Sequence, residues 1–532
     1  MSNPSSVAAN AISADVGQQA PGWEYKLCLN GSDYADAPSG FAQIGALLTP
    51  AEAARSGAPL NTGLKMANDT IIHVASMSKP VCVTAFVAML DDWRDLANGV
   101  KGTGPLAATT GLAIRSATPP IQPLPIQGTQ VPLWLVPALF SAPLAAQLVN
   151  AGLLTIVPQS LHNMVNAVAF NGALCSMVEL DSPRRPSTEE TPAAGLLTAA
   201  NPRASRFPAE IQPLPGYASL LTQVIKGVAV PQPTDYFLPY IQSSLQAKAT
   251  ALGVPYQVGQ GMASVTIGQL ITHTSAIPNG FTDLSAVNPS LVTFTQPVQP
   301  TNGGPVTCDI WAYLLAFVSQ PANGQPGYKN DDYNILGEVV AACVGMLYDD
   351  YVYARLFSDP QFGALRRYVT DVLNSSDYYT GTGPNFSAGN PFPDYRGFGA
   401  CGGFYYTADQ ITQWMYTLYS GASVQRATGT GPSGPLVSQT GRNMLFGTTA
   451  YFSAGNSPTA GNVPPLSSWI TYPHNGGTTV GNGSCNGEMA IAVGPNGDVM
   501  TAFFCANGSL NADVPFNDAL QGILTSAYPP AG

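Results

Sequence analysis

The chain has 532 residues, of which 45% are hydrophobic and only 10% are charged, and its formal net charge is −11. A chain of this length and apolar content can bury a large core, whereas its acidic balance argues against nucleic acid as a partner. Prolines at 132, 137, 143 and 158 interrupt the most apolar region, so no transmembrane span is predicted.

The N-terminal region and the cysteines indicate in which cellular compartment the protein is expected. Residues 1–20 are small and polar and lack a positive segment followed by a long apolar one, so no signal peptide is predicted in the sequence as given. A soluble protein is expected, either cytoplasmic or secreted as a mature form. The eight cysteines form no C-x-x-C pair, which disfavours zinc and redox motifs, and their spacing does not specify disulfides. Neither a metal nor a cofactor is predicted.

In chain order, the first predicted elements are two strands, at residues 23–29 and 41–48, separated by a polar loop. A helix is expected from residue 76 to about residue 92, because an apolar run opens there into a helical pattern. A second helix is expected at residues 335–344, after a Pro-Gly turn.

The C-terminal part has the pattern of a sheet. Residues 489–493 and 499–505 are apolar runs, and the intervening Gly-Pro-Asn-Gly-Asp at 494–498 is a strong hairpin signal. A closing helix is expected at residues 516–526.

The tetrapeptide Ser76-Met77-Ser78-Lys79 carries the first chemical signal. On a helix, Ser76 and Lys79 share one face because they are three residues apart. The N–H groups at a helix N-terminus favour a serine oxygen that gains negative charge, and burial can depress the pKa of a lysine enough for it to accept a proton. S-x-x-K is therefore a nucleophile-plus-base unit, although an isolated match is usually a solvated helix face.

Two later segments favour the catalytic interpretation. Tyr328 and Asn330 follow a Pro-Gly turn at the junction of a loop and the predicted helix, where side chains can point into a cleft. His474-Asn475-Gly476-Gly477 lies in a strand-like stretch, and its glycines let a strand edge approach a substrate closely. Each pattern is weak in isolation, but their order and spacing after S-x-x-K are much more specific.

Together these segments resemble the serine β-lactamase-like superfamily, in the branch of class C β-lactamases, family VIII esterases and DD-peptidases. Residues 266–277, TIGQLITHTSAI, are similar to the family stretch TIRDLLTHTSGL. Residues 233–239 and 399–409 are similar to two further family segments. The resemblance covers roughly residues 20–95 and 233–530.

The resemblance implies an α/β (α+β) fold, in which an antiparallel sheet flanked by helices lies beside a mainly helical domain, with the active site between them. Residues 1–75 and 400–532 would form the sheet domain, and residues 76–399 the helical domain. Residues 94–232 form a large insertion that is atypical of the family and has no charged residue from 116 to 178. Three interpretations stay open for it: an extension packed on the catalytic domain, a cap over the cleft, or a subunit interface that makes a homo-oligomer.

The resemblance also implies roles for individual residues. Ser76 would be the acylated nucleophile, and Lys79 would transfer protons beside it. Tyr328 would act as general base in acylation and as acid toward the leaving group, and Asn330 would orient the substrate or Lys79. His273 is expected to stabilise a loop.

The third motif departs from that of the β-lactamases. His474-Asn475-Gly476 stands where the class C enzymes have Lys-Thr-Gly, whose lysine helps to bind a substrate carboxylate. Backbone N–H groups of Ser76 and Gly477 would form the oxyanion hole. Lys329 is unusual for the family, and its side chain is expected to point to solvent.

These features predict a serine hydrolase that acts through an acyl-enzyme on a small-molecule ester or amide. An acyltransferase, and a D-amino-acid peptidase or β-lactamase, are the alternatives within the superfamily. A non-catalytic penicillin-binding or scaffold protein of the same fold is the alternative from another class.

Overall fold

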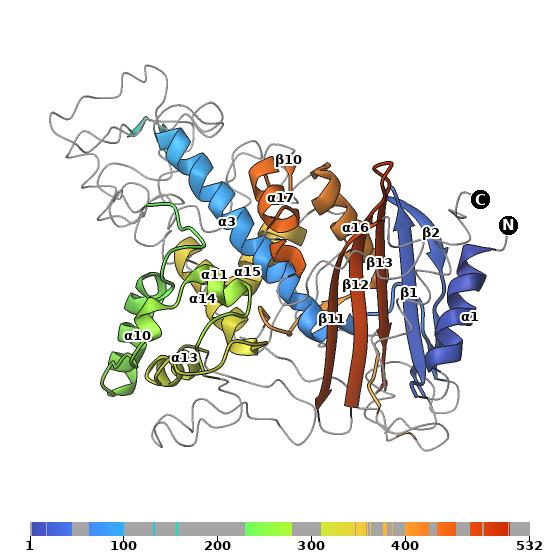
Figure 1. Cartoon of the computed structure of the whole chain (residues 1–532), viewed down its shortest axis with the longest axis horizontal. Coiled ribbons are helices and arrows are strands. Elements are labelled where there is room, and N and C mark those ends of the chain that lie inside the picture. The colour runs from blue at the N-terminus through green and yellow to red at the C-terminus, as the bar shows by residue number, and fades with distance from the viewer. Residues whose placement is uncertain are drawn as a thin grey trace.

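An antiparallel sheet and a group of helices make up the part of the chain that the structure describes (Figure 1). The structure is a computed structural model, and it describes residues 3–16, 19–44, 63–100, 131–132, 156–157, 229–278, 310–345, 347–357, 359, 362, 376–379, 386, 399–424, 434–448, 450–453, 469–480, 483–508 and 510.

The sheet has seven strands in the order β11-β12-β13-β1-β3-β4, with β2 also paired to β1. All neighbouring strands in it run antiparallel. The N-terminal strands therefore lie beside the C-terminal ones, and β11 is at one edge. The strands are β1 (Gly22–Leu29), β2 (Ser32–Asp36), β3 (Ser39–Gln43), β4 (Leu64–Lys65), β11 (Ile470–Val480), β12 (Gly483–Val493) and β13 (Val499–Ala506).

The two faces of the sheet bury different cores, because successive side chains of a strand point to opposite faces. On the outer face, Trp23, Tyr25 and Leu27 of β1 pack with helix α1 (Pro4–Val16). The inner face belongs to the main core, which continues into the helices. Figure 1 shows α1 alone on the outer side and the other helices on the inner side.

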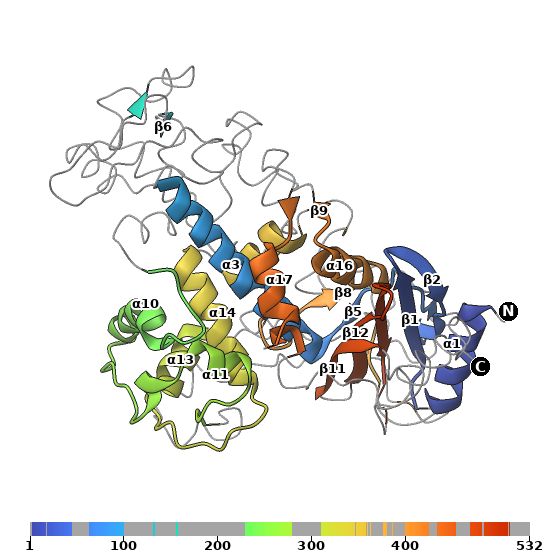
Figure 2. The same cartoon turned by 45° about the horizontal axis from the view of Figure 1, so that its top comes forward.

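Helix α3 (Ser78–Val100) runs through the middle of the molecule, and its residues from Val81 to Leu90 are buried almost without interruption. It packs against α14 (Asn330–Val344) on one side and α17 (Gln439–Phe446) on the other. Helices α10 (Leu238–Leu252), α11 (Ile267–Ile271) and α13 (Ile310–Val318) gather around α14, away from the sheet (Figure 2). Helix α16 (Ala408–Ser420) covers part of the inner face of the sheet.

Most elements predicted from the sequence are present. The fold class, the strand at 23–29 and the C-terminal hairpin are confirmed. The helix predicted at 335–344 is present but begins earlier, at Asn330. The strand predicted at 41–48 is present as β3, which ends at Gln43, and residues 45–48 lie outside the described residues. The helix expected from residue 76 begins instead at Ser78, after a 3-10 turn, η2 (Ala75–Met77), and it continues to Val100. Strand β2 was not predicted, because its sequence alternates charged and small residues without an apolar run.

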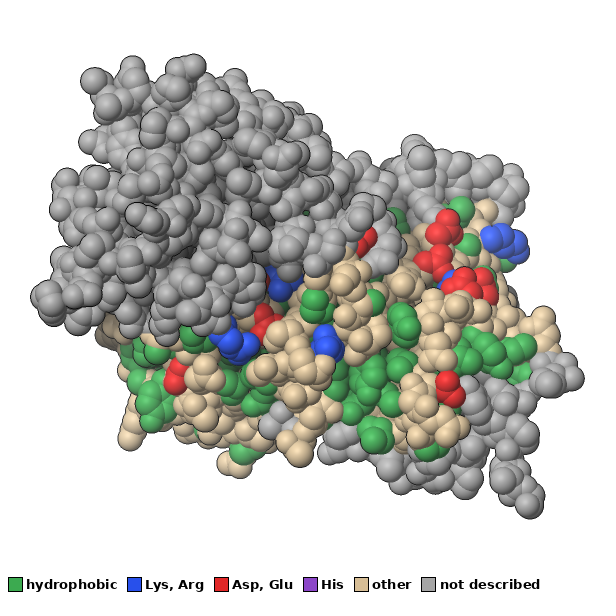
Figure 3. All heavy atoms as spheres, turned by 90° about the horizontal axis from the view of Figure 1, so that it is seen from above, with side chains coloured by type: hydrophobic (Ala, Val, Ile, Leu, Met, Phe, Trp, Pro, Cys, Tyr) green, Lys and Arg blue, Asp and Glu red, His purple; other side chains and the backbone are tan. Residues whose placement is uncertain are grey.

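Other predictions fall outside the described residues. These are the helix at 516–526 and nearly all of the insertion at 94–232. Beyond α3, the described residues of the insertion are 229–232 and the parallel pair β6 (Val131–Pro132) and β7 (Ile156–Val157). The domain boundaries at residues 75 and 400 remain a prediction. None of the helices in the described ranges is long and apolar enough to cross a bilayer. Figure 3 shows that the described surface on one face carries few charged side chains.

Candidate active site

Ser76 lies on the turn η2, directly before α3 and against the edge strand β11. The preceding residue, Ala75, has a φ of 46°, which is a costly conformation for a residue with a β-carbon. The hydroxyl of Ser78 accepts a hydrogen bond from the backbone N–H of Phe404 at 3.3 Å. The turn that carries Ser76 is thus held in a strained, fixed geometry, as expected of a positioned nucleophile.

The amine of Lys79 is fully buried and has four hydrogen-bond neighbours. Its Nζ lies 2.9 Å from Ser76 Oγ, 2.5 Å from Tyr328 Oη, 2.8 Å from Asn330 Oδ1 and 2.8 Å from the backbone oxygen of Cys401. The sequence placed Ser76, Lys79, Tyr328 and Asn330 in one site, and the structure brings all four together.

Burial makes the neutral form of Lys79 accessible near neutral pH. Burial lowers its pKa to about 8, although the buried Asp331 and Asp332 favour the charged form. A neutral amine has two N–H groups and one lone pair. The amide oxygen of Asn330 and the carbonyl of Cys401 can only accept, so they take the two N–H groups. The lone pair can then accept the proton of Ser76, whose Oγ lies 2.9 Å away.

Tyr328 completes the cluster from the loop before α14. Its hydroxyl donates a hydrogen bond to Ser76 Oγ. The ring is 52% exposed, but the hydroxyl end is directed at Lys79 and Ser76, and burial raises the pKa of Tyr328 to about 12. The phenol therefore keeps its proton at neutral pH and can donate it.

A second cluster, formed by His273, Ser275, Lys329 and Asp332, fixes the loop that carries Tyr328. The ring of His273 lies 4.6 Å from that of Tyr328, and its Nδ1 lies 2.8 Å from Asp332 Oδ2 and 3.2 Å from the backbone N of Lys329. The hydroxyl of Ser275 donates to Asp332 Oδ1 at 2.5 Å. His273 thus stabilises the loop as predicted, and it does so at a φ of 55°.

The expectation for Lys329 is wrong. Its side chain is not in solvent: the residue is 5% exposed, and Nζ donates to the backbone oxygen of Ser275 at 2.7 Å. Sequence reasoning also missed Ser275 and Asp332. Asp332 follows Tyr328 by four residues and lies in the first turn of α14. This spacing was the signal from which the contact of Asp332 with the Tyr328 loop could have been predicted.

Strand β11 brings the third motif beside Ser76. A β-carbon on Gly476 would lie 2.5 Å from the backbone oxygen of Val74 and 2.9 Å from the backbone N of Met77, so only glycine allows this approach. Gly477 is exposed next to it on the edge strand. The oxyanion role of the Ser76 and Gly477 N–H groups stays a prediction.

His474 is 1% exposed, and its Nδ1 lies 2.9 Å from the backbone oxygen of Asn475. Burial, and then the charge of Lys79, lower its pKa to about 3. The imidazole is therefore neutral and cannot supply the positive charge that a lysine would supply at this position.

A family comparison agrees with this geometry. The model of the family described as Beta-lactamase matches residues 240–523, which is more than half of the chain. The chain belongs to the beta-lactamase family. The predicted membership of the serine β-lactamase-like superfamily is thereby confirmed, and no curated protein matches the sequence significantly.

Solved structures similar to this beta-lactamase family member share little sequence with it. EstCE1, a hydrolase with promiscuous acyltransferase activity, is 10% identical over 98% of each chain, with a TM-score of 0.45. The D-amino acid amidase from Ochrobactrum anthropi SV3 is 11% identical over 98% of this chain and 99% of its own, with a TM-score of 0.44. FmtA from Staphylococcus aureus is 10% identical over 97% of this chain and 89% of its own, with a TM-score of 0.44.

The described part of this family member offers no group of three or more His, Cys, Asp or Glu side chains arranged to hold a metal ion. Its six described cysteines are free thiols, at positions 28, 82, 343, 401, 485 and 505.

Proposed function

We propose that the protein is a serine hydrolase that cleaves esters or amides through an acyl-enzyme at Ser76. The observation that carries this proposal is the contact of the buried Lys79 amine with both Ser76 Oγ and Tyr328 Oη, while its remaining hydrogen bonds go to groups that only accept. A structural lysine in this fold has no need to be desolvated next to two hydroxyl groups.

In the proposed acylation, Ser76 Oγ attacks the substrate carbonyl carbon and its proton passes to Lys79, directly or through Tyr328. Backbone N–H groups of Ser76 and Gly477 stabilise the oxyanion. When the intermediate collapses, the bond to the leaving group breaks and Tyr328 donates its proton to that group, drawing a proton back from Lys79. Water then attacks the acyl carbon and gives one proton to Lys79; the bond from Ser76 Oγ to the acyl carbon breaks, Ser76 Oγ takes that proton back, and the acid is released.

The pKa values assign these steps. A pKa of about 8 makes Lys79 a usable base near neutral pH, and a pKa of about 12 makes Tyr328 a proton donor and relay rather than the resting base. This assignment moves the primary base from Tyr328, the residue expected from the family resemblance, to Lys79.

The state of His474 supports esters and simple amides over β-lactams and peptides with a free carboxylate. Because the imidazole is buried and neutral, it provides no counter-charge for a carboxylate. The acyltransferase alternative differs from the hydrolase only in the nucleophile that attacks the acyl-enzyme, which is an alcohol or amine in place of water. The peptidase alternative differs only in the leaving group. A non-catalytic scaffold protein would gain nothing from the contacts of Lys79.

The test is hydrolysis of p-nitrophenyl butyrate by the wild type, by Ser76→Ala and by Ser264→Ala. Ser264 is an exposed serine whose hydroxyl donates to the nearby Gly261 carbonyl, its one hydrogen-bond partner among the described residues, so it controls for the substitution itself. Loss of at least about 10³-fold in kcat in Ser76→Ala alone is expected. Equal activity of Ser76→Ala and wild type would contradict the proposal. Adding alcohol or amine acceptors to the same assay separates transfer from hydrolysis.

A further inference from the structure

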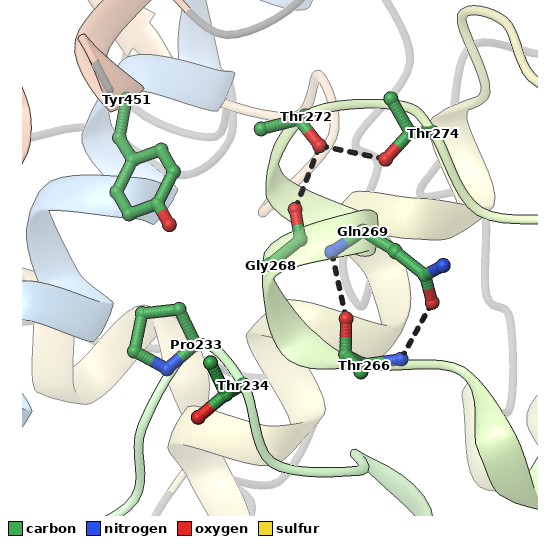
Figure 4. Close-up of a pocket in the computed structure, with 8 residues that line it drawn as sticks. All are labelled: Pro233, Thr234, Thr266, Gly268, Gln269, Thr272, Thr274 and Tyr451. Carbon is green, nitrogen blue, oxygen red and sulfur yellow. Dashed lines mark hydrogen bonds between the residues drawn. The ribbon is translucent and has the colours of Figure 1, made fainter. Parts of the chain in front are cut away.

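A pocket of about 510 Å³ opens between α11 and the 3-10 turn η10 (Tyr451–Ser453), as Figure 4 shows. This volume is within the usual range of small-molecule sites, roughly 300–1,000 Å³. The eight described residues that line it are Pro233, Thr234, Thr266, Gly268, Gln269, Thr272, Thr274 and Tyr451.

Both walls of the pocket belong to segments that also contact residues of the candidate active site. On the helical side, Thr272 and Thr274 flank His273, whose ring lies 4.6 Å from that of Tyr328. On the other side, η10 packs against β11, the strand that carries His474. The pocket therefore lies beside the Tyr328 end of the site.

The lining exposes mostly apolar surface, interrupted by hydroxyl and amide groups, and none of the lining residues is charged. The hydroxyl of Thr272 donates to the backbone oxygen of Gly268 at 2.8 Å and lies 2.9 Å from the hydroxyl of Thr274, so the two threonines form a short chain of hydroxyl groups. In Figure 4 the hydroxyl of Tyr451 points into the gap between the two walls. No described residue forms a hydrogen bond with it.

We propose that this pocket binds a neutral, hydroxyl-rich part of the substrate, such as a sugar or polyol, on the leaving-group side of the bond that is cleaved. This inference rests on the proposed function, in which Tyr328 donates its proton to the leaving group. Because Thr272 and Thr274 are the chain neighbours of His273, whose ring contacts that of Tyr328, a leaving group long enough to extend beyond the Tyr328 ring would reach this pocket.

The chemistry of the lining selects the ligand class. A sugar presents apolar C–H faces to the aromatic ring of Tyr451 and the apolar ring of Pro233, and hydroxyl groups to the threonines. A charged group finds no counter-charge among the lining residues. A purely apolar alcohol leaves the hydroxyl group of Tyr451 without a partner, at a cost of about 1–3 kcal/mol if that group becomes buried.

Binding tests the pocket without any turnover. The full chain carrying Ser76→Ala is titrated with methyl glucoside and, separately, with butan-1-ol, and followed by ligand-observed NMR. Saturable binding of methyl glucoside at roughly millimolar Kd is expected for a ligand of this size. Adding Tyr451→Ala or the exposed-site change Thr274→Val is expected to weaken it about 5-fold or more, whereas Thr250→Val, an exposed threonine of α10, leaves it unchanged. Glucoside binding that these pocket variants do not alter, absence of saturable binding, or tighter binding of butan-1-ol would overturn the proposal.

Kinetics separate the pocket from the reaction. Wild type is expected to cleave glucose 6-butyrate about 10-fold better in kcat/KM than ethyl butyrate, and Tyr451→Ala to lose that preference mainly through KM. Equal rates on both esters in wild type would refute the pocket and leave the hydrolase intact. Binding of methyl glucoside by a protein that cleaves neither ester would refute the hydrolase and leave the pocket intact.

Discussion

The amine of Lys79 lies 2.8 Å from the backbone oxygen of Cys401, a residue 322 positions further along the chain. The two meet because β5 (Ile72–His73) pairs with β8 (Tyr405–Tyr406), which places the turn at 399–404 against the turn of Ser76. A carbonyl oxygen accepts but cannot donate, so this contact fixes one N–H of Lys79 and helps to aim its lone pair at Ser76.

The first prediction concerns pH. Because Lys79 must be neutral to accept a proton, kcat/KM for an ester is expected to rise with pH through an apparent pKa of about 8 and then to stay level. Tyr328, with a pKa of about 12, stays protonated throughout. The measurement is kcat/KM for p-nitrophenyl butyrate from about pH 6 to about pH 10, corrected for uncatalysed hydrolysis.

The control for that profile is Lys79→Arg, which keeps a positive charge that cannot be removed. Its activity is expected to fall by about 10³-fold and to lose the rise with pH. A wild-type profile that is flat across this range would remove Lys79 from the role of base.

The second prediction concerns Tyr328. Tyr328→Phe removes the hydroxyl that bridges Lys79 and the leaving group, and kcat is expected to fall roughly 10²–10⁴-fold. Stability should change little, because half of the ring is exposed. Tyr236→Phe is a matched control, since Tyr236 is also 52% exposed. Near-normal kcat in Tyr328→Phe would end the assignment of Tyr328 as proton donor.

The sequence predicted which residues meet in the candidate site better than it predicted their surroundings. Ser76, Lys79, Tyr328 and Asn330 were recognisable because each is part of a short motif with a chemical rationale. The partner of Lys79 on the opposite segment, the carbonyl of Cys401, is a backbone atom, and no side-chain pattern reports where a carbonyl points.

Long-range contacts account for the main error. Lys329 was expected in solvent because lysine usually keeps its charge hydrated. The carbonyl of Ser275, which accepts its hydrogen bond, is available only because the loop at 273–276 folds against α14. The pairing of β5 with β8 is also tertiary, since each strand has only two residues and little strand propensity can be read from them.

The third prediction tests that contact. Lys329→Met keeps the length of the side chain but removes the donor to Ser275, leaving a buried carbonyl oxygen short of a hydrogen bond. The free energy of unfolding is expected to fall by about 1–3 kcal/mol. Because Lys329 adjoins Tyr328, kcat should fall roughly 10-fold to 100-fold through displacement of the phenol, with KM less affected. Chemical denaturation and steady-state kinetics measure both effects. Lys65→Met, at an exposed lysine on β4, is the control, and a Lys329→Met enzyme that matched it would show that the contact is dispensable.

The last prediction concerns a buried carboxyl group of the sheet. Glu24 of β1 is fully buried, and neither of its oxygens has a hydrogen-bond partner among the described residues. Burial, and then the negative charges of Asp409, Asp69 and Asp36, raise its pKa well above 4.5. The neighbouring Lys26 does not offset this, because its amine is 2.6 Å from Asp409 and 2.9 Å from Asp33.

Glu24 is therefore protonated in the folded state at pH values where the unfolded chain has already lost that proton. As the pH rises above 4.5, the folded state binds one more proton than the unfolded state, so stability falls until the folded pKa is passed. Glu24→Gln removes this term. The difference in free energy of unfolding, variant minus wild type, should be lowest near pH 4 and should increase by up to about 1.4 kcal/mol per pH unit. Any effect of the amide group itself adds the same amount to this difference at every pH. Denaturant unfolding of both proteins from about pH 4 to about pH 8 measures the difference. A difference independent of pH would mean that Glu24 is ionised in the folded protein and has found a partner.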